Sequence, residues 1–176
     1  MKLKCDFITN SSSSSFIVAW PTKIKEYGDV KQFMMFTEQA QVVFEDAKKK
    51  NKEMEDGLIQ GLIIDDSEQI LNMVTEEISN GYFEGCDSYF DDKEFQEICR
   101  VDIETEEHRE KSRKFFEKVE EKNKKTARGL AEKFVSENKG KFLYFFSYSD
   151  NDGEFYSKME HDDIFSKLEY LRISHH

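Results

Sequence analysis

The residues best suited to chemistry gather near the two ends of the sequence. A run of five serines follows Asn10, and a histidine with two aspartates lies a short distance before a terminal pair of histidines. Serine hydroxyls and main-chain amides can hold an anion or accept a phosphate, whereas histidine beside carboxylates suits acid–base work or metal binding. The candidate binding residues are Asn10, Ser11, Ser12, Ser13, Ser14, Ser15, His161, Asp162, His175 and His176.

The serine run has three interpretations. It is a flexible polar connection, a loop that cradles an anion, or an acceptor for modification. No glycine lies within it to let the backbone approach a phosphate, and no Gly-Lys-Ser sequence accompanies it. The polar connection is therefore the simplest interpretation, and the other two stay open.

The aspartates after His161 also have an interpretation that needs no function. Asp162 and Asp163 precede "IFSKLEYL", which we expect to be a final short helix. Aspartates at the start of a helix accept hydrogen bonds from its free amides and favour its positive end. Helix capping is the simpler explanation, and a metal or acid–base site with His161 is the alternative. His175 and His176 are either ligands, an ordered native terminus or the remnant of a purification tag.

No catalytic motif stands out elsewhere. No glycines of the kind that flank a nucleophilic serine surround any hydroxyl, so no Ser-His-Asp arrangement is identifiable. The three cysteines, Cys5, Cys86 and Cys99, lack the Cys-x-x-Cys spacing of a zinc site and cannot form a disulfide framework. The sequence predicts no metal and no cofactor, and it favours a binding function over an enzymatic one.

Composition narrows the class of partner and the compartment. The 176 residues suffice for one domain, and the hydrophobic share of 38% with a charged share of 36% indicates a packed core under a charged surface. The formal charge of −11 repels phosphate backbones, so we expect a protein partner and no nucleic acid. The sequence has no apolar run of about 20 residues, which a membrane-spanning helix needs, and no leader peptide. A cytoplasmic protein without membrane contact is expected.

The elements that must position the candidate residues begin with a strand. "FIVAW", residues 16–20, has no polar alternation and stops at Pro21, which predicts a short strand buried on both faces. "KLKCDFI", residues 2–8, could be its partner. A helix is expected from Asp29 as its cap, and it either continues or restarts at Thr37. Residues 57–64 fit either a strand or a buried helical turn.

Further helices are predicted from cap residues and apolar periodicity. Their expected bounds are Asp66 to Gly81, Asp92 to Val101 and Thr105 to Gly140. After them, two strand-like runs flank "SDNDG", which has the turn chemistry of a hairpin. The predicted fold is α+β: a single domain with a small antiparallel sheet, made of the N-terminal strand and a C-terminal hairpin, covered by several helices.

One string is distinctive. "CDFITNSSSSSFIVAW", residues 5–20, resembles the N-terminal signature of a scattered set of uncharacterised bacterial and phage proteins, in which Asp-Phe-Ile/Val-Thr-Asn precedes a serine run and an apolar strand. The tail from residue 146 is similar to the ends of some of them. The resemblance implies a phage or mobile-element origin, a native terminal His-His pair, and terminal histidines that lie near the serines.

Two functions remain as hypotheses. The first is a small acidic binding or regulatory protein that acts on a protein partner. The alternative is a hydrolase or a nucleotide- or metal-binding protein whose site combines the serine run, His161 and the terminal histidines.

Overall fold

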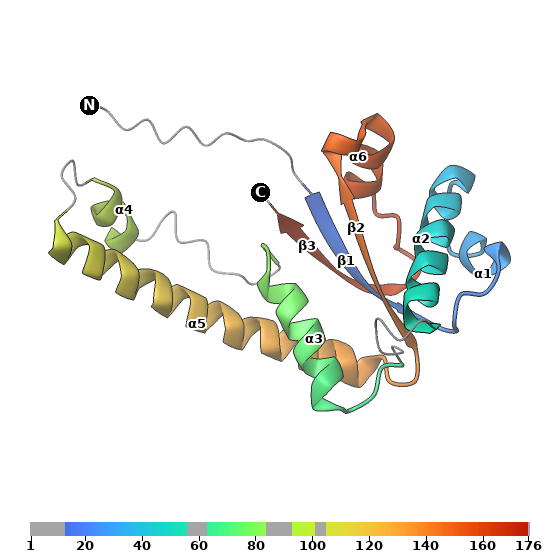
Figure 1. Ribbon diagram of the computed structural model, residues 1–176, viewed down its shortest axis with the longest axis horizontal. Coiled ribbons are helices and arrows are strands. Elements are labelled where there is room, and N and C mark those ends of the chain that lie inside the picture. Colours follow the sequence, from blue (N-terminus) through green and yellow to red (C-terminus); the bar gives the residue numbers. More distant parts are fainter. Residues whose placement is uncertain (1–12, 56–62, 84–92, 101–104, 176) are drawn as a thin grey trace.

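The computed structural model describes residues 13–55, 63–83, 93–100 and 105–175. Three antiparallel strands form a sheet in the order β2-β1-β3, so the first strand lies in the middle. Helices cover both faces of this sheet (Figure 1). The predicted α+β fold with a small antiparallel sheet is confirmed. The strands are β1 (Ser13–Trp20), β2 (Phe142–Ser149) and β3 (Glu169–His175).

The central position of β1 follows from its sequence. Each residue from Phe16 to Trp20 is at most 1% exposed, as expected for a strand with apolar side chains on both faces. Phe16, Val18 and Trp20 pack on one side against residues of α1, α2 and α6, while Ile17 and Ala19 pack on the other against α3 and α5. These helices are α1 (Tyr27–Lys31), α2 (Thr37–Glu55), α3 (Glu68–Ser79), α5 (Glu106–Glu137) and α6 (Glu154–His161).

Two helix caps differ from the prediction. Glu26, not Asp29, caps α1; Asp29 lies inside the first turn and accepts hydrogen bonds from the amides of residues 25 and 26 at 2.8 and 3.0 Å. Ser67, not Asp66, caps α3, and its hydroxyl accepts from the Ile70 amide at 3.4 Å. Asp66 instead forms an ion pair with Lys139 at 2.7 Å. In both cases a neighbouring polar residue took the cap position.

The restart at Thr37 and the start of the longest helix at Thr105 are confirmed. The Thr105 hydroxyl accepts a hydrogen bond from the His108 amide at 3.2 Å. The helix expected between residues 92 and 101 is α4 (Lys93–Cys99). Of the ambiguous stretch 57–64, only Ile63 and Ile64 are described, and Ile63 forms a single bridge to Phe142.

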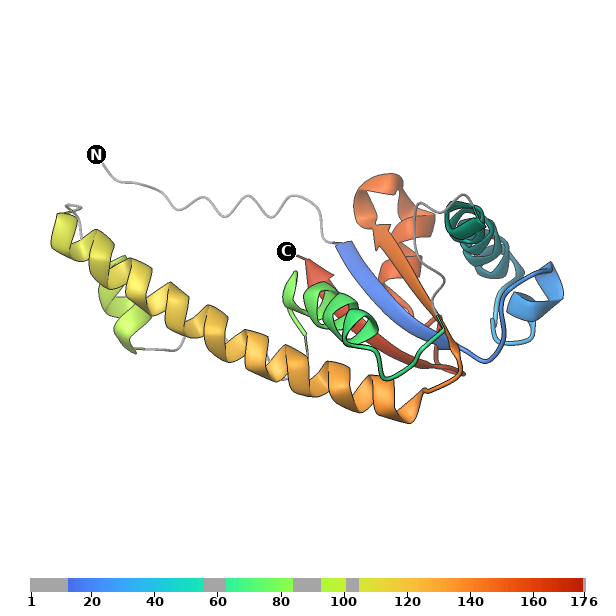
Figure 2. The same ribbon diagram turned by 60° about the horizontal axis from the view of Figure 1, so that its bottom comes forward.

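Helix α5 contains 32 residues and is about 48 Å long at 1.5 Å per residue. Its C-terminal half packs on α3 and the sheet, and its N-terminal half extends beyond them to meet α4 (Figure 2). We call α4 together with residues 106–121 of α5 the arm. Within the described residues, no helix is both long and apolar enough to cross a membrane.

The predicted C-terminal hairpin is wrong. Residues 154–161 form helix α6 rather than a strand, and the expected final helix is a turn followed by β3. Strands β2 and β3 therefore pair with β1 from opposite sides and not with each other. The missed signal is the alternation in "YLRIS", where apolar Leu171 and Ile173 alternate with Tyr170 and Arg172. The suggested partner strand, residues 2–8, lies outside the described residues.

Candidate functional site

Three of the candidate serines belong to the sheet. Ser13, Ser14 and Ser15 are the first residues of β1 and pair with both neighbouring strands. The interpretation of the run as a flexible polar connection is therefore wrong for these three, because ladder hydrogen bonds fix a backbone in place. Asn10, Ser11, Ser12 and His176 lie outside the described residues.

The structure brings Ser15 and His175 together. The His175 Nε2 lies 3.0 Å from the Ser15 Oγ, and the His175 Nδ1 lies 3.2 Å from the carbonyl oxygen of Asn80. A carbonyl oxygen only accepts hydrogen bonds, so in the neutral imidazole Nδ1 must carry the proton. The lone pair on Nε2 then accepts the hydrogen bond from the Ser15 hydroxyl.

The turn after α3 holds the imidazole in this position. Tyr82 and Ser174 exchange two backbone hydrogen bonds, at 2.7 and 2.8 Å, which attach the turn to the end of β3. Gly81 makes the close approach possible, since a Cβ at this position would lie 2.6 Å from the Ser174 carbonyl oxygen and 2.8 Å from the His175 Nδ1. From the sequence, Gly81 is expected only to end the preceding helix, and Asn80 does not stand out. The Asn80-Gly81 pair, which is typical of turns, was the signal in the sequence that could have indicated this turn.

Other hydroxyls share this end of the sheet. In the strand register Ser15 lies opposite Ser147, and Ser13 lies between Ser149 and His175. Residues directly opposite in antiparallel strands project from the same face. Ser147 is exposed while Ser15 is 7% exposed, so this face is open to solvent on the β2 side. A serine, an imidazole and neighbouring hydroxyls thus gather on one face.

The Ser14 side chain lies on the opposite face of the sheet and is part of the packed interior. It is fully buried, and its hydroxyl accepts a hydrogen bond from the Arg172 Nε at 3.3 Å. The Arg172 guanidinium lies over the Phe16 ring, 5.9 Å from the centroid. A cation over an aromatic face is attracted by the ring quadrupole, so these contacts attach β3 to β1.

His161 and Asp162 do not join the serine site. They end helix α6, which packs on the face of the sheet opposite to Ser15. Asp162 is the last cap residue of α6 and accepts a hydrogen bond from the Gln39 Nε2 at 3.4 Å, so its predicted role at the start of a final helix is wrong. The exposed His161 ring has its Nε2 3.9 Å from a carboxylate oxygen of Glu160.

The environments of two carboxylates beside these residues were not predicted from the sequence. Asp163 accepts a hydrogen bond from the Tyr170 hydroxyl, and burial together with this carboxylate raises the pKa of Tyr170 to about 12. Glu160 is only 1% exposed, and its Oε2 has no hydrogen-bond partner within the described residues. Nothing in the local sequence "KMEHDD" separates this buried carboxylate from the exposed ones beside it.

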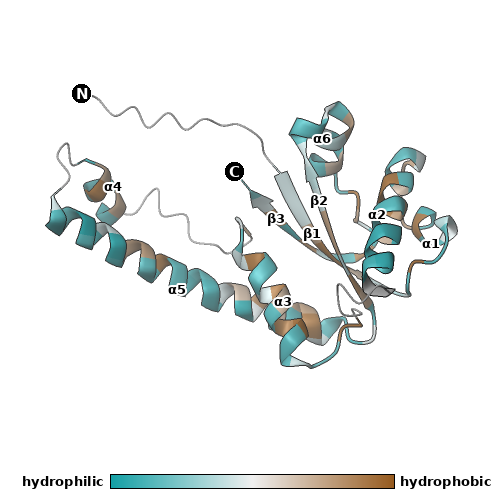
Figure 3. Ribbon diagram, viewed as in Figure 1, coloured by the Kyte–Doolittle hydropathy of each residue, from teal (hydrophilic) through white to brown (hydrophobic). Residues whose placement is uncertain are grey.

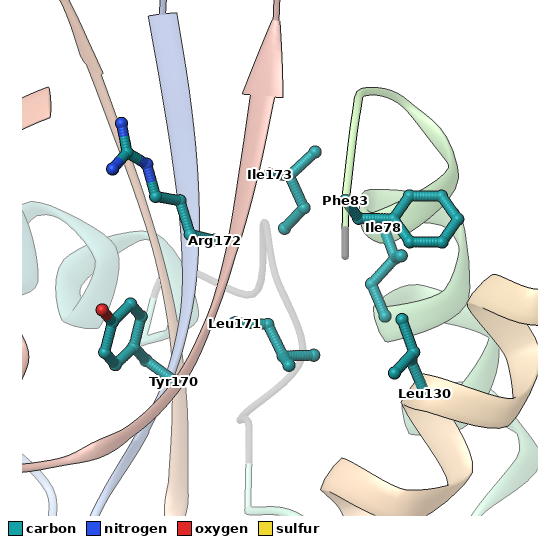
Figure 4. Close-up of a pocket in the computed structure, with 7 residues that line it drawn as sticks. All are labelled: Ile78, Phe83, Leu130, Tyr170, Leu171, Arg172 and Ile173. Carbon is teal, nitrogen blue, oxygen red and sulfur yellow. The ribbon is translucent and has the colours of Figure 1, made fainter. Parts of the chain in front are cut away.

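The described residues include two clefts, of which the first borders the strand position of Ile173 opposite Ser15. One has a volume of about 260 Å³ between β3 and the helices α3 and α5. Figure 4 shows Leu171 and Ile173 pointing toward Ile78 and Leu130, with Tyr170 and Arg172 on the other side of the strand. The second cleft has about 520 Å³ and is lined by Phe36, Thr37, Glu38, Gln39, Phe155, Lys158 and Asp162. We call it the α2–α6 cleft.

The described residues contain no group of three histidine, cysteine, aspartate or glutamate side chains placed to hold a metal ion. No family model, curated protein or solved structure matches this chain.

Proposed function

We propose that the chain is a small acidic binding or regulatory protein that engages a protein partner at the α2–α6 cleft. The observation that carries the proposal is the exposure of two adjacent apolar side chains at the edge of this cleft. Met35 is 71% and Phe36 58% exposed in the turn between α1 and α2. Their neighbour Met34 is buried in the core, so the turn directs Met35 and Phe36 outward.

Exposed apolar side chains of this kind are a feature of interaction surfaces. Aromatic residues and methionine are enriched in the cores of protein interfaces, and an apolar patch with a polar rim marks a binding site. Phe36 and Phe155 supply the apolar lining of the cleft, and the rest of the lining is polar or charged. A side chain inserted here would contact both rings.

Charge indicates the kind of partner. The rim contains Glu38 and Asp162, and its one lysine, Lys158, is paired with Glu154 at 3.1 Å. With a net charge of −11 on the chain, the cleft attracts cations. The partner we propose presents an apolar side chain flanked by lysine or arginine.

The proposal includes a cellular setting. A place in the bacterial cytosol rests on the three dispersed cysteines, and an origin in a phage or mobile element rests on the resemblance of residues 5–20. The same negative charge that favours a basic protein segment disfavours nucleic acid.

Selection from a random displayed peptide library tests this proposal. We expect enriched peptides to carry Phe, Leu or Met next to Lys or Arg, and Phe36→Ser to weaken their binding at least about 10-fold, which corresponds to 1.4 kcal/mol. Phe116→Ser, at a phenylalanine of the arm that is 42% exposed, is the matched control and should bind as the parent does. Enrichment of peptides that bind the Phe36→Ser variant equally well, or of no such motif, would overturn the proposal.

A further inference from the structure

The Ser15–His175 pair supports an activity separate from partner binding. We propose that Ser15 and His175 form a nucleophile–base pair that transfers acyl groups from small carboxylic esters. The substrate class follows from the groups present: a serine hydroxyl that can attack a carbonyl carbon and an imidazole that can accept its proton. The proposal does not depend on the α2–α6 cleft.

The geometry has the three parts that an activated serine needs. The 3.0 Å separation of Ser15 Oγ and His175 Nε2 is within the range for direct proton transfer. The Asn80 carbonyl, 3.2 Å from Nδ1, fixes the tautomer that leaves Nε2 basic. A backbone carbonyl thus takes the orienting position that a carboxylate occupies in a Ser-His-Asp triad.

The three groups come from separate elements that are fixed relative to one another. Ser15 lies on the central strand, His175 on β3 and Asn80 in the turn after α3. The ladder between β1 and β3 joins the first two, and the Tyr82–Ser174 bridge joins the third. Such pre-organisation lowers the entropy cost of reaching a reactive arrangement.

A substrate would reach Ser15 from the side of β2. Ser147, directly opposite Ser15, is exposed, so the sheet face is accessible there. Side chains in such opposite positions have Cβ atoms about 4.5–5.5 Å apart. The Ser147 hydroxyl is therefore near enough to donate a hydrogen bond to the oxyanion that forms when Ser15 attacks.

The reaction balances without a cofactor. The Ser15 Oγ attacks the ester carbonyl carbon while its proton passes to His175 Nε2. The carbon–oxygen bond of the leaving group then breaks, and the proton moves from Nε2 to the departing alkoxide, which releases the alcohol and leaves acyl-Ser15. A water molecule, deprotonated by Nε2, attacks this ester; the carboxylic acid departs and Ser15 regains its proton.

Labelling with a fluorophosphonate probe tests the nucleophile directly. We expect one adduct per chain, located on Ser15 by peptide mass mapping, and a rate at least about 100-fold lower in His175→Gln, since a general base contributes 10²- to 10⁴-fold. Glutamine can still donate a hydrogen bond to the Asn80 carbonyl but provides no base. Ser14→Ala, on the opposite face of the same strand, should label as the parent does. No adduct on Ser15, or equal rates in His175→Gln, would overturn the proposal.

A second variant separates catalysis from a structural role for the same hydrogen bond. In Ser15→Cys, a neighbouring imidazole should lower the pKa of the new thiol and speed its alkylation by iodoacetamide. At pH 7 we expect the cysteine at position 15 to be alkylated at least about 10-fold faster in the Ser15→Cys variant than in the double variant Ser15→Cys, His175→Gln. The exposed Cys99 is the reference site in each digest. Equal rates in two folded variants with the same circular dichroism spectrum would show that His175 only holds β3 in place.

Discussion

The sheet with its covering helices and the arm are stabilised in different ways, although α5 belongs to both. In the sheet region apolar side chains are buried between layers, and the inner half of α5 contributes Ala127, Ala131 and Phe134. The outer half is mostly hydrophilic (Figure 3) and carries ion pairs one turn apart, such as Glu110 with Lys114 at 3.2 Å. Its apolar contacts with α4 include the stacking of Phe115 on Phe95.

The two halves of one helix are therefore stabilised by different interactions. Exposed ion pairs contribute little to stability and weaken in salt, whereas burial of apolar area is the main favourable term in folding. The small residues Ala127 and Ala131 let α5 approach its neighbours closely. The arm is therefore expected to open locally without unfolding of the sheet region.

Trp20→Ala is expected to have the largest effect. The indole is fully buried, contacts the rings of Phe33, Tyr144 and Phe165, and donates to the Asp29 carbonyl at 3.2 Å. Its loss should cost about 3–5 kcal/mol in urea unfolding, because the cavity cannot collapse fully. Phe116→Ala in the arm should cost under about 1 kcal/mol, since a surface substitution away from the core has a small effect. Similar losses of stability in both variants would contradict the conclusion that the sheet region and the arm are stabilised in different ways.

Gly81→Ala is expected to cost about 1–3 kcal/mol, because the added methyl group forces the turn away from β3. The added Cβ would lie 2.6 Å from the Ser174 carbonyl oxygen, 2.6 Å from the Ile173 Cγ2 and 2.8 Å from the His175 Nδ1. Thermal unfolding measures the loss. Gly129→Ala is the matched control, since its Cβ meets nothing within 4 Å; it should stabilise the helix by about 0.5–1 kcal/mol. A neutral Gly81→Ala would show that the close approach is not required.

Thr105→Ala removes the cap of α5 at the arm end and should cost about 1 kcal/mol locally. Amide exchange in residues 106–121 should then speed up about 5-fold, with little change in the midpoint of global unfolding. Ser67→Ala removes the corresponding cap of α3, which is packed on the sheet, and should lower the global midpoint instead. An equal fall of the global midpoint in both variants would show that the arm unfolds together with the sheet region.

Asp46→Asn tests the smallest effect, a difference in pH dependence. Burial raises the pKa of Asp46, whose carboxylate accepts from the Tyr148 hydroxyl at 3.3 Å. The folded state then binds more protons than the unfolded state, so stability falls as pH rises from the unfolded pKa of about 3.9 through the folded value. Urea unfolding at pH 4 and pH 7 should show Asp46→Asn gaining relative to the parent at pH 7.

In the arm, Glu121 is expected to contribute a pH dependence of stability opposite to that of Asp46. The Lys125 ammonium, 2.8 Å away, lowers the pKa of the Glu121 carboxyl, so its stabilising effect is present above the unfolded pKa of about 4.3 and is lost as pH falls. Glu121→Gln should therefore lose stability relative to the parent at pH 7 and not at pH 4. The same direction in both variants would contradict the assigned causes.

Several elements could be predicted because their signals are local. The strand at residues 16–20 follows from five apolar residues before Pro21, and the start of α5 follows from Thr105 ahead of two glutamates. The exchange of helix and strand after Gly153 was missed because "EFYSKMEH" and "EYLRISH" both mix apolar and polar residues over short lengths. Gly153, with φ 108°, is the N-cap of α6. A glycine with positive φ is also common in hairpin turns, so this residue did not distinguish a helix start from a hairpin.

The fold class, the strand buried on both faces and the acidic charge could be predicted from the sequence, because composition, apolar runs and cap residues act through neighbours along the chain. Which polar residues come into contact depends on the tertiary fold. His175 is 160 residues from Ser15 and 95 residues from Asn80 in the sequence. Only the strand register and the turn at Gly81 bring these residues within hydrogen-bond distance. His161, equally prominent in the sequence, ends helix α6, which packs on the other face of the sheet.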